Sequence, residues 1–324
     1  MHERESQVAV FSASGTLLQE ARMETRDLSK FINSLPGEKR VAMESIGFVY
    51  PLYDKLSALP KCHVSVANPY KLGLIAKSNT KNDRADAKVL GELLRTNFLP
   101  LSWIPEYQET REKIFVVKDR VRYGIRRSAI KCSIRWLLKR RGIDIKSPFT
   151  PSGRKKLQGM GLLEMDSRLE ELALVEKAIQ KLDSVIERLA SKDKNAKLLD
   201  TIPGVAAYTA IFLSSSIGEI DRFPDSKHLC AYFGLVPSLH QSGDTFLTGH
   251  ITKAGNKWVR RNLTECARVA VRKDPHLRKF YLELRHKRGE KKALVATTRK
   301  IVAYAFWMLK RNLTYEELAP WTTM

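Results

Sequence analysis

The chain has 324 residues, of which 43% are hydrophobic, so it is long enough for two or three domains and is globular rather than disordered. It carries 57 lysines and arginines against 35 aspartates and glutamates, and this net charge of +22 favours a polyanionic partner. No apolar run approaches the roughly 20 residues that span a bilayer. The first residues do not form a signal peptide, and no Cys-x-x-Cys occurs. We therefore expect a cytoplasmic protein with reduced thiols, a nucleic-acid partner and no membrane.

The first third of the chain predicts an α/β domain over residues 1–105. Apolar, β-prone stretches around Ser14-Gly15 predict a hairpin over 6–23, and Pro36-Gly37 ends a short helix capped by Thr25 or Asp27. The remaining predicted elements are strands and helices in alternation: strand Arg40–Glu44, helix Phe48–Leu59, strand His63–Ala67 broken by Asn68-Pro69, amphipathic helix Asp83–Arg95 and strand Pro100–Ile104.

Residues 106–195 predict basic helices followed by a linker. Positions 111–141 hold 12 lysines and arginines against 2 acids, and a loop is expected around Pro151-Ser152-Gly153. Further on, apolar residues from Met165 to Leu189 recur at intervals of three and four. This spacing fits the seam of a coiled coil or of a long helical hairpin, either of which could be an oligomer arm. A helix packed on its own domain is the alternative.

Residues 196–324 predict a mostly helical third domain. Its Ile202-Pro203-Gly204 segment resembles the turn of a helix-hairpin-helix, where backbone N–H groups can meet a phosphate, but an ordinary turn between helices is about as probable. A second basic block covers 253–311. The cations expected to bind nucleic acid come from both blocks: Arg126, Arg127, Lys131, Lys253, Lys257, Arg260 and Arg261. Trp136 and Trp258 could stack on bases, although core packing is the preferred interpretation of each.

Three acids are the candidate metal ligands. Asp83 and Asp86 lie three residues apart at a helix start, so their side chains share a face, and two close carboxylates repel unless a cation lies between them. Glu44 ends a predicted strand, where sites form in open α/β sheets. Together they could bind Mg²⁺ and clamp a phosphate. The alternatives are favourable charge at a helix N-terminus for the pair, and an ordinary surface position for Glu44.

Ser242 is the candidate nucleophile, in a loop that contains Gly243 and follows His240. No Gly-x-Ser-x-Gly elbow surrounds it, so an esterase is a weak interpretation.

An ordered set of segments resembles the DEDD transposases, serine-dependent insertion-sequence recombinases guided by a bridge RNA. The resemblance covers nearly the whole chain. The segments that carry it are Met43-Glu44-Ser45-Ile46-Gly47, Asn68-Pro69, Asp83-Arg84-Ala85-Asp86-Ala87, Ile202-Pro203-Gly204, Tyr232-Phe233-Gly234-Leu235-Val236-Pro237, Gln241-Ser242-Gly243, Thr252-Lys253-Ala254-Gly255-Asn256 and Arg260-Arg261-Asn262-Leu263.

The resemblance implies a RuvC-like (RNase H) N-terminal domain, a coiled-coil linker and a C-terminal transposase domain with the serine. Glu44, Asp83 and Asp86 would match three of four metal-binding acids, and Ser242 the nucleophile. The implied activity is Mg²⁺-dependent DNA strand cleavage and exchange through a 5′-phosphoserine link. The implied partners are donor and target DNA, a bridge RNA, and further copies of the chain in a dimer to tetramer, where serine and acids come from different subunits.

The start of the chain departs from this pattern. The family opens with a strand ending in Gly-Ile-Asp-x-His, and His2 matches that histidine, so the first acid and its strand would precede Met1. We expect the 324-residue chain to lack that central strand, to bind metal poorly and to cleave little. The hypothesis is that the active protein is translated from an earlier codon, and the rival is a decayed copy.

Two other functions remain as alternatives. A RuvC-like junction nuclease that uses metal-activated water would need the acids but not Ser242. A catalytically inactive, truncated relative would bind nucleic acid in a salt-sensitive way and give no product with any metal.

Overall fold

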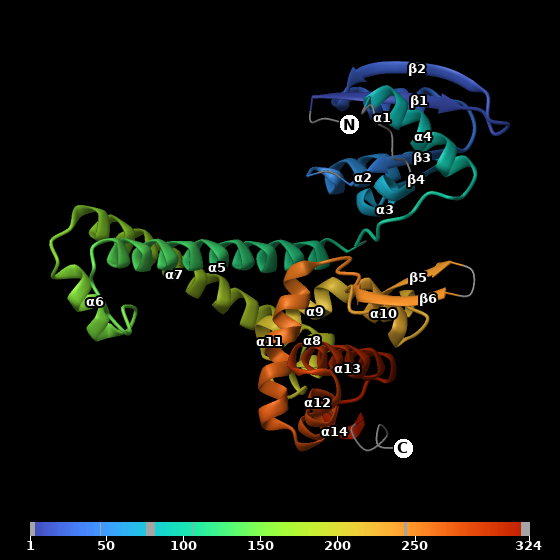
Figure 1. Cartoon of the computed structure of the whole chain (residues 1–324). Helices are drawn as coiled ribbons and strands as arrows, with labels where there is room; N and C mark the ends of the chain where they lie inside the picture. The colour runs from blue at the N-terminus through green and yellow to red at the C-terminus, as the bar shows by residue number, and fades with distance from the viewer. Residues whose placement is uncertain (1–3, 46, 76–81, 106, 243–244, 319–324) are drawn as a thin grey trace. The chain divides into compact units, whose positions relative to one another are not determined.

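The computed structural model describes residues 4–45, 47–75, 82–105, 107–242 and 245–318, and it leaves the side chains of residues 240–242, 245 and 246 undescribed. The chain forms two compact units, Met1–Glu106 and Tyr107–Met324, which are described separately below (Figure 1).

The first unit contains two pairs of strands and short helices. Its elements in chain order are β1 (Glu5–Phe11), β2 (Leu17–Glu24), the 3-10 turn η1 (Thr25–Asp27), α1 (Leu28–Ser34), β3 (Lys39–Glu44), α2 (Val49–Ser57), β4 (Cys62–Ala67), α3 (Pro69–Ile75) and α4 (Asp83–Arg95). β1 and β2 pair antiparallel, whereas β3 and β4 pair parallel with Glu44 opposite Ala67. A core of residues such as Met43, Leu56 and Val66 lies between β3–β4 and the helices α1 and α2. The predicted α/β pattern is confirmed, and the RuvC-like interpretation stays a prediction.

Three details of this unit differ from expectation. Residues 100–104 form no strand, because Leu101 makes only a single bridge to Ala67 and the prolines at 100 and 105 lack an N–H for a ladder. Asn68-Pro69 begins helix α3 instead of only ending β4, since Asn68 Oδ1 accepts a hydrogen bond from Lys71 N at 3.1 Å. No side-chain cap holds the start of α1.

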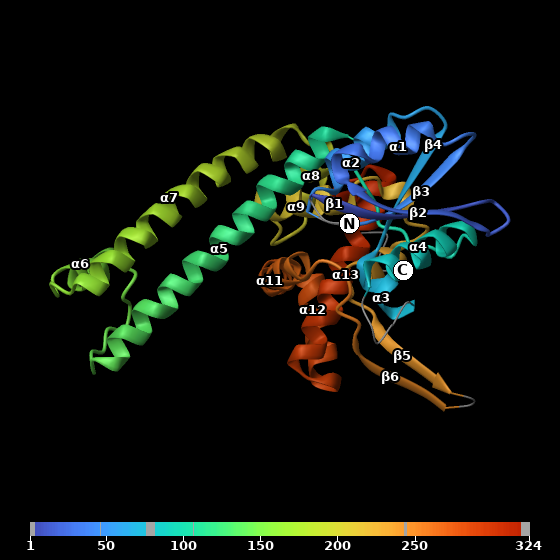
Figure 2. The ribbon, with the colours of Figure 1, turned by 90° about the horizontal axis from the view of Figure 1, so that it is seen from above.

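The second unit begins with a long antiparallel helical hairpin. Its helices are α5 (Gln108–Arg140), α6 (Pro151–Gln158) and α7 (Leu163–Lys192). Met165, Leu172, Val175 and Ile179 of α7 are buried together with the apolar face of α5, so the hairpin interpretation of the seam is confirmed (Figure 2). Pro151 starts α6 and does not belong to a loop, because the Thr150 side chain accepts from Gly153 N and caps the helix.

The rest of this unit is a helical domain with one β-hairpin. Its elements are α8 (Lys194–Asp200), α9 (Ala207–Ile217), the 3-10 turn η2 (Ile220–Arg222), α10 (Ser226–Tyr232), β5 (Pro237–Ser242), β6 (Thr245–Ile251), α11 (Lys257–Lys273), α12 (Pro275–Arg288), α13 (Glu290–Arg311) and α14 (Tyr315–Leu318). Its core also takes in Val117 of α5 and Ile186 of α7, so the base of the long hairpin packs into the domain. Among the described helices, none is long and apolar enough to cross a membrane.

Two expectations for this unit need comment. Trp136 is 60% exposed, so core packing is the wrong interpretation for it, whereas Trp258 packs against the core. The turn between α8 and α9 faces inward. Ile202 and Val205 are buried, and Gly204 approaches the backbone of α11 so closely that an added Cβ would lie 2.7 Å from the Cys266 carbonyl oxygen. This packing favours an ordinary turn between helices.

Candidate active site and nucleic-acid surface

Glu44 is the last residue of β3, and Asp83 and Asp86 lie in the first turn of α4. Helix α4 packs along β3, and Arg40 Nη2, near the start of β3, donates to Asn97 Oδ1, just past the end of α4, at 2.7 Å. Leu94, near the end of α4, shares a core cluster with Ala67, which pairs with Glu44 across β3 and β4.

The three acids do not form a closed metal cage. Glu44 and Asp86 are half-buried, and Asp83 is exposed. No group of three or more His, Cys, Asp or Glu side chains within the described ranges is arranged to hold a metal ion. Their chemistry still suits Mg²⁺, which is commonly bound through one or two carboxylates while substrate phosphates and water supply the remaining oxygens.

Glu20 of β2 holds the first turns of α4, and no local pattern in the sequence points to this role. Its Oε2 accepts from Arg84 Nε at 2.6 Å, and its Oε1 lies 2.6 Å from Lys88 Nζ. The Glu20 side chain is only 12% exposed. Arg84 lies between Asp83 and Asp86 in sequence. The contact with Glu20 therefore pairs the Arg84 guanidinium with an acid other than these two aspartates.

Ser242 is the last residue of β5. The sequence predicts that it lies in an irregular loop, and that prediction is wrong. In the β5–β6 register Ser242 stands opposite Thr245, and its side chain is outside the described part. The hairpin projects from the helical domain (Figures 1 and 2). Leu239 and Leu247, on β5 and β6, are 59% and 62% exposed. The candidate nucleophile thus lies near the tip of an arm with apolar side chains in solvent.

The base of this arm is held rigidly. Gly234 has φ +67° and approaches the following loop so closely that an added Cβ would lie 2.3 Å from the Ala254 carbonyl oxygen. Arg260 Nη1 donates to the carbonyls of Phe233, Ala254 and Gly255, and burial lowers the pKa of its guanidinium. Arg260 therefore has a structural role that sequence reasoning missed, beside its predicted contact with nucleic acid.

The other predicted nucleic-acid residues fall into two groups. On α5, Arg126 pairs with Glu171 at 2.9 Å and Lys131 pairs with Glu176 at 3.2 Å, while Arg127 is half-buried. Near α11, the second group is exposed and consists of Lys253, Lys257 and Arg261. The cations near α11 are thus more available to a polyanion than those on α5.

Comparison with known proteins shows what the chain is similar to. Residues 196–282 match the model of the transposase IS116/IS110/IS902 family, a range that includes the Ser242 hairpin and most of α12. The chain is 27% identical to the transposase for insertion sequence element IS1111A of Coxiella burnetii over 268 residues, 76% of this chain and 71% of that protein. It is 26% identical to the transposase for insertion sequence element IS1328 of Yersinia enterocolitica over 80% of this chain and 78% of the relative.

A third relative is described by a different name. The pilin gene-inverting protein of Moraxella bovis is 25% identical over 264 residues, 78% of this chain and 74% of that protein. Residues 196–282 are thus similar to the IS116/IS110/IS902 transposase family, and the chain is similar to insertion-sequence transposases over most of its length.

Proposed function

We propose that this transposase cleaves and rejoins DNA through a covalent link between Ser242 and a DNA phosphate, with Mg²⁺ held by Glu44, Asp83 and Asp86. The observation that supports the metal site is the packing of α4 on β3, because these two elements carry Glu44 and the two aspartates. When bound there, Mg²⁺ would neutralise charge on the phosphate.

In the proposed reaction the phosphorus remains in a diester, first between two nucleotides and then between serine and one nucleotide. The Ser242 hydroxyl oxygen bonds to phosphorus, and the bond from phosphorus to the 3′ oxygen breaks. The serine proton is lost, and the departing 3′ oxygen becomes a hydroxyl. The 5′ phosphate stays on serine, so a 3′-hydroxyl from another strand can displace it without an external energy source.

The proposal extends to a guide RNA and to a dimer or tetramer in which Ser242 of one subunit serves the acids of another. Two observations support an inter-subunit site. The serine and the acids belong to different compact units, and the arm exposes Leu239 and Leu247. An isolated two-stranded hairpin is marginally stable in water, so a docked arm would be better ordered.

Trapping the protein–DNA link tests the chemistry. Donor and target DNA, the RNA transcribed beside the gene and Mg²⁺ are incubated with the protein expressed from the gene in its natural upstream context. We expect a denaturant-resistant adduct that Ser242→Ala abolishes together with cleavage. Ser238→Ala, on the same strand, is the matched control and keeps both.

The other outcomes identify the alternatives. Cleavage that survives Ser242→Ala without an adduct would establish a nuclease that uses metal-activated water. Salt-sensitive binding with no product under Mg²⁺ or Mn²⁺ would establish a non-catalytic binder.

A further inference from the structure

The two basic blocks of the second unit differ in how their charges are balanced. Five of the twelve cations at positions 111–141 pair with acids of α7 or with Asp193, the residue between α7 and α8. The pairs are Lys113–Asp193, Arg120–Asp183, Arg126–Glu171, Lys131–Glu176 and Arg141–Glu164. These contacts join the two long helices of the hairpin, so part of the charge of this block is balanced within the protein.

The cations where α11 meets α12 and along α12 are not balanced in this way. They are all exposed, and none forms an ion pair with a described residue: Arg272, Lys273, Arg278, Lys279, Arg285, Lys287 and Arg288. Like charges held this close repel one another in the free protein, and a polyanion relieves that repulsion.

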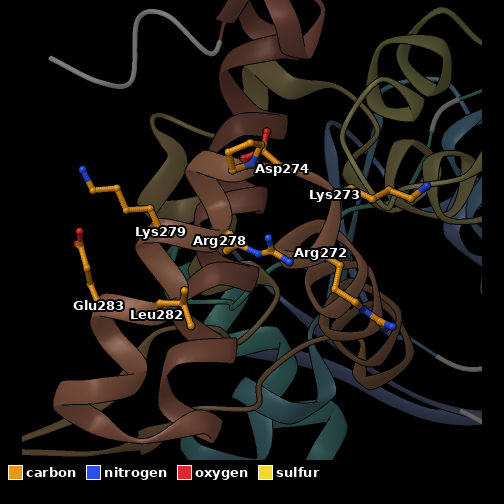
Figure 3. A pocket seen from close by; sticks show the side chains of 8 residues that line it. Arg272, Lys273, Asp274, Arg278, Lys279, Leu282 and Glu283 are labelled. Atoms are coloured by element: carbon orange, nitrogen blue, oxygen red, sulfur yellow. The ribbon is translucent and has the colours of Figure 1, made fainter.

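Four of these cations line a cavity of about 530 Å³ at the corner between the two helices. In Figure 3, Arg278 extends toward the side of Arg272, while Lys279 and Glu283 extend from the other side of α12. The cavity also has two acids. Asp274 Oδ1 accepts from Leu277 N at 2.6 Å and its Oδ2 from Tyr315 Oη at 3.1 Å, and Asp274 keeps its negative charge because both donors are neutral. Glu283 is the second acid, so four cations face two carboxylates.

We propose that this corner, lined by Arg272, Lys273, Arg278 and Lys279, binds the phosphate backbone of duplex DNA. No aromatic side chain lines the cavity, whereas surfaces for single strands usually stack bases on aromatic rings. Lysine and arginine without base-reading partners fix the position of a duplex but not its sequence. The choice of DNA rests on the proposed function, which supplies duplex DNA as substrate.

Salt titration of duplex binding tests the assignment. Each lost phosphate contact lowers the slope of log affinity against log salt concentration by about 0.9. We expect Arg272→Gln, Lys273→Gln, Arg278→Gln and Lys279→Gln together to lower the slope by about 3 to 4 and the affinity by roughly 100-fold or more in fluorescence anisotropy with a 30-base-pair duplex.

A matched variant controls for net charge. Lys155→Gln, Lys156→Gln, Lys177→Gln and Lys181→Gln removes the same charge from exposed positions of α6 and α7, and its slope should change by less than about 1. The single change Glu283→Gln should strengthen binding about two- to three-fold because it removes one opposing acid. Should the fourfold α11–α12 variant not fold, the two double variants should each lower the slope by about 2.

The outcomes separate this inference from the proposed function. Ser242→Ala should bind the duplex with the wild-type slope even though it forms no adduct, so a failure of the serine chemistry leaves the binding test intact. Equal losses in both fourfold variants, an unchanged slope in the α11–α12 variants, or a loss confined to duplex RNA of the same sequence would each overturn the assignment.

Discussion

Lys113 Nζ lies 2.8 Å from Asp193 Oδ2, and the two side chains are only 11% and 10% exposed. Asp193 Oδ1 also accepts from Ala196 N at 2.8 Å and from Ser214 Oγ at 3.0 Å. One carboxylate thus caps α8 and ties α5 and α9 to the end of α7. Burial by itself lowers the pKa of Lys113, but hydrogen bonds to Asp193 and Glu109 outweigh it and the pKa lies above its ordinary value.

Asp193→Ala should destabilise the second unit by about 2 to 4 kcal/mol, because it removes a cap and leaves a shielded lysine without that partner. Asp193→Asn can still cap α8 and should lose roughly half as much. Urea unfolding followed by circular dichroism measures both, and equal stability of the alanine variant and wild type would contradict the assigned role. Because the folded pKa of Lys113 is raised, its contribution is complete at neutral pH and is lost only as the pH rises through that value.

A pH effect of opposite sign is expected at Glu176. The hydrogen bond from Arg154 lowers its pKa most, burial opposes that effect, and Lys131 adds to the lowering. A depressed carboxyl pKa contributes stability above the unfolded value, near 4.3, that disappears as the pH falls through the folded value. Glu176→Gln should therefore cost about 1 kcal/mol at pH 7 and almost nothing near pH 2. A cost that does not depend on pH would show that the charge of Glu176 is not involved.

The sequence predicts the elements better than the contacts between them. Hairpin, strand and helix boundaries such as Asp83–Arg95 follow from local periodicity and turn residues, and the structure has them. The predicted strand at residues 100–104 is wrong, because a β-prone segment forms a strand only when a neighbouring strand can pair with it through a continuous row of backbone hydrogen bonds. The position of Glu44 relative to the two aspartates depends on how α4 packs on β3, and the role of Glu20 depends on a contact 64 residues away. No local pattern encodes either relationship.

Gly204 should tolerate no side chain. Its φ is +86°, and an added Cβ would lie 2.7 Å from the Cys266 carbonyl oxygen and 2.9 Å from Ala270 N. Both contacts are with helix backbone that cannot yield cheaply. Gly204→Ala should cost about 3 kcal/mol through strain and overpacking together.

Gly142 supplies the control for that change. It has a similar φ of +68°, but an added Cβ would meet nothing within 4 Å. Gly142→Ala should therefore cost only about 1 kcal/mol, the strain of the left-handed backbone. Thermal unfolding of the two variants separates conformation from packing, and equal losses would mean that α11 moves away from the α8–α9 turn without penalty.

Glu20→Gln should loosen the helix that carries both aspartates. The carboxylate of Glu20 holds Arg84 and Lys88, one turn apart on α4, from the neighbouring strand β2. A neutral amide loses the charge-assisted part of both contacts, which should cost about 1 to 2 kcal/mol for so shielded a group. Arg84 is then free to pair with the adjacent Asp83 or Asp86 and compete with a cation there. Hydrogen exchange of the α4 amides should rise about 5- to 30-fold, and the apparent affinity for Mn²⁺ should fall.

Glu5→Gln is the matched control, because Glu5 pairs with Arg22 on the same two strands but both side chains are at least half exposed. The effect of Glu5→Gln on stability should stay below about 0.5 kcal/mol. If exchange in α4 rises equally in both variants, Glu20 contributes no more than an ordinary surface ion pair, and the position of the aspartates must depend on the packing of α4 against β1 and β3.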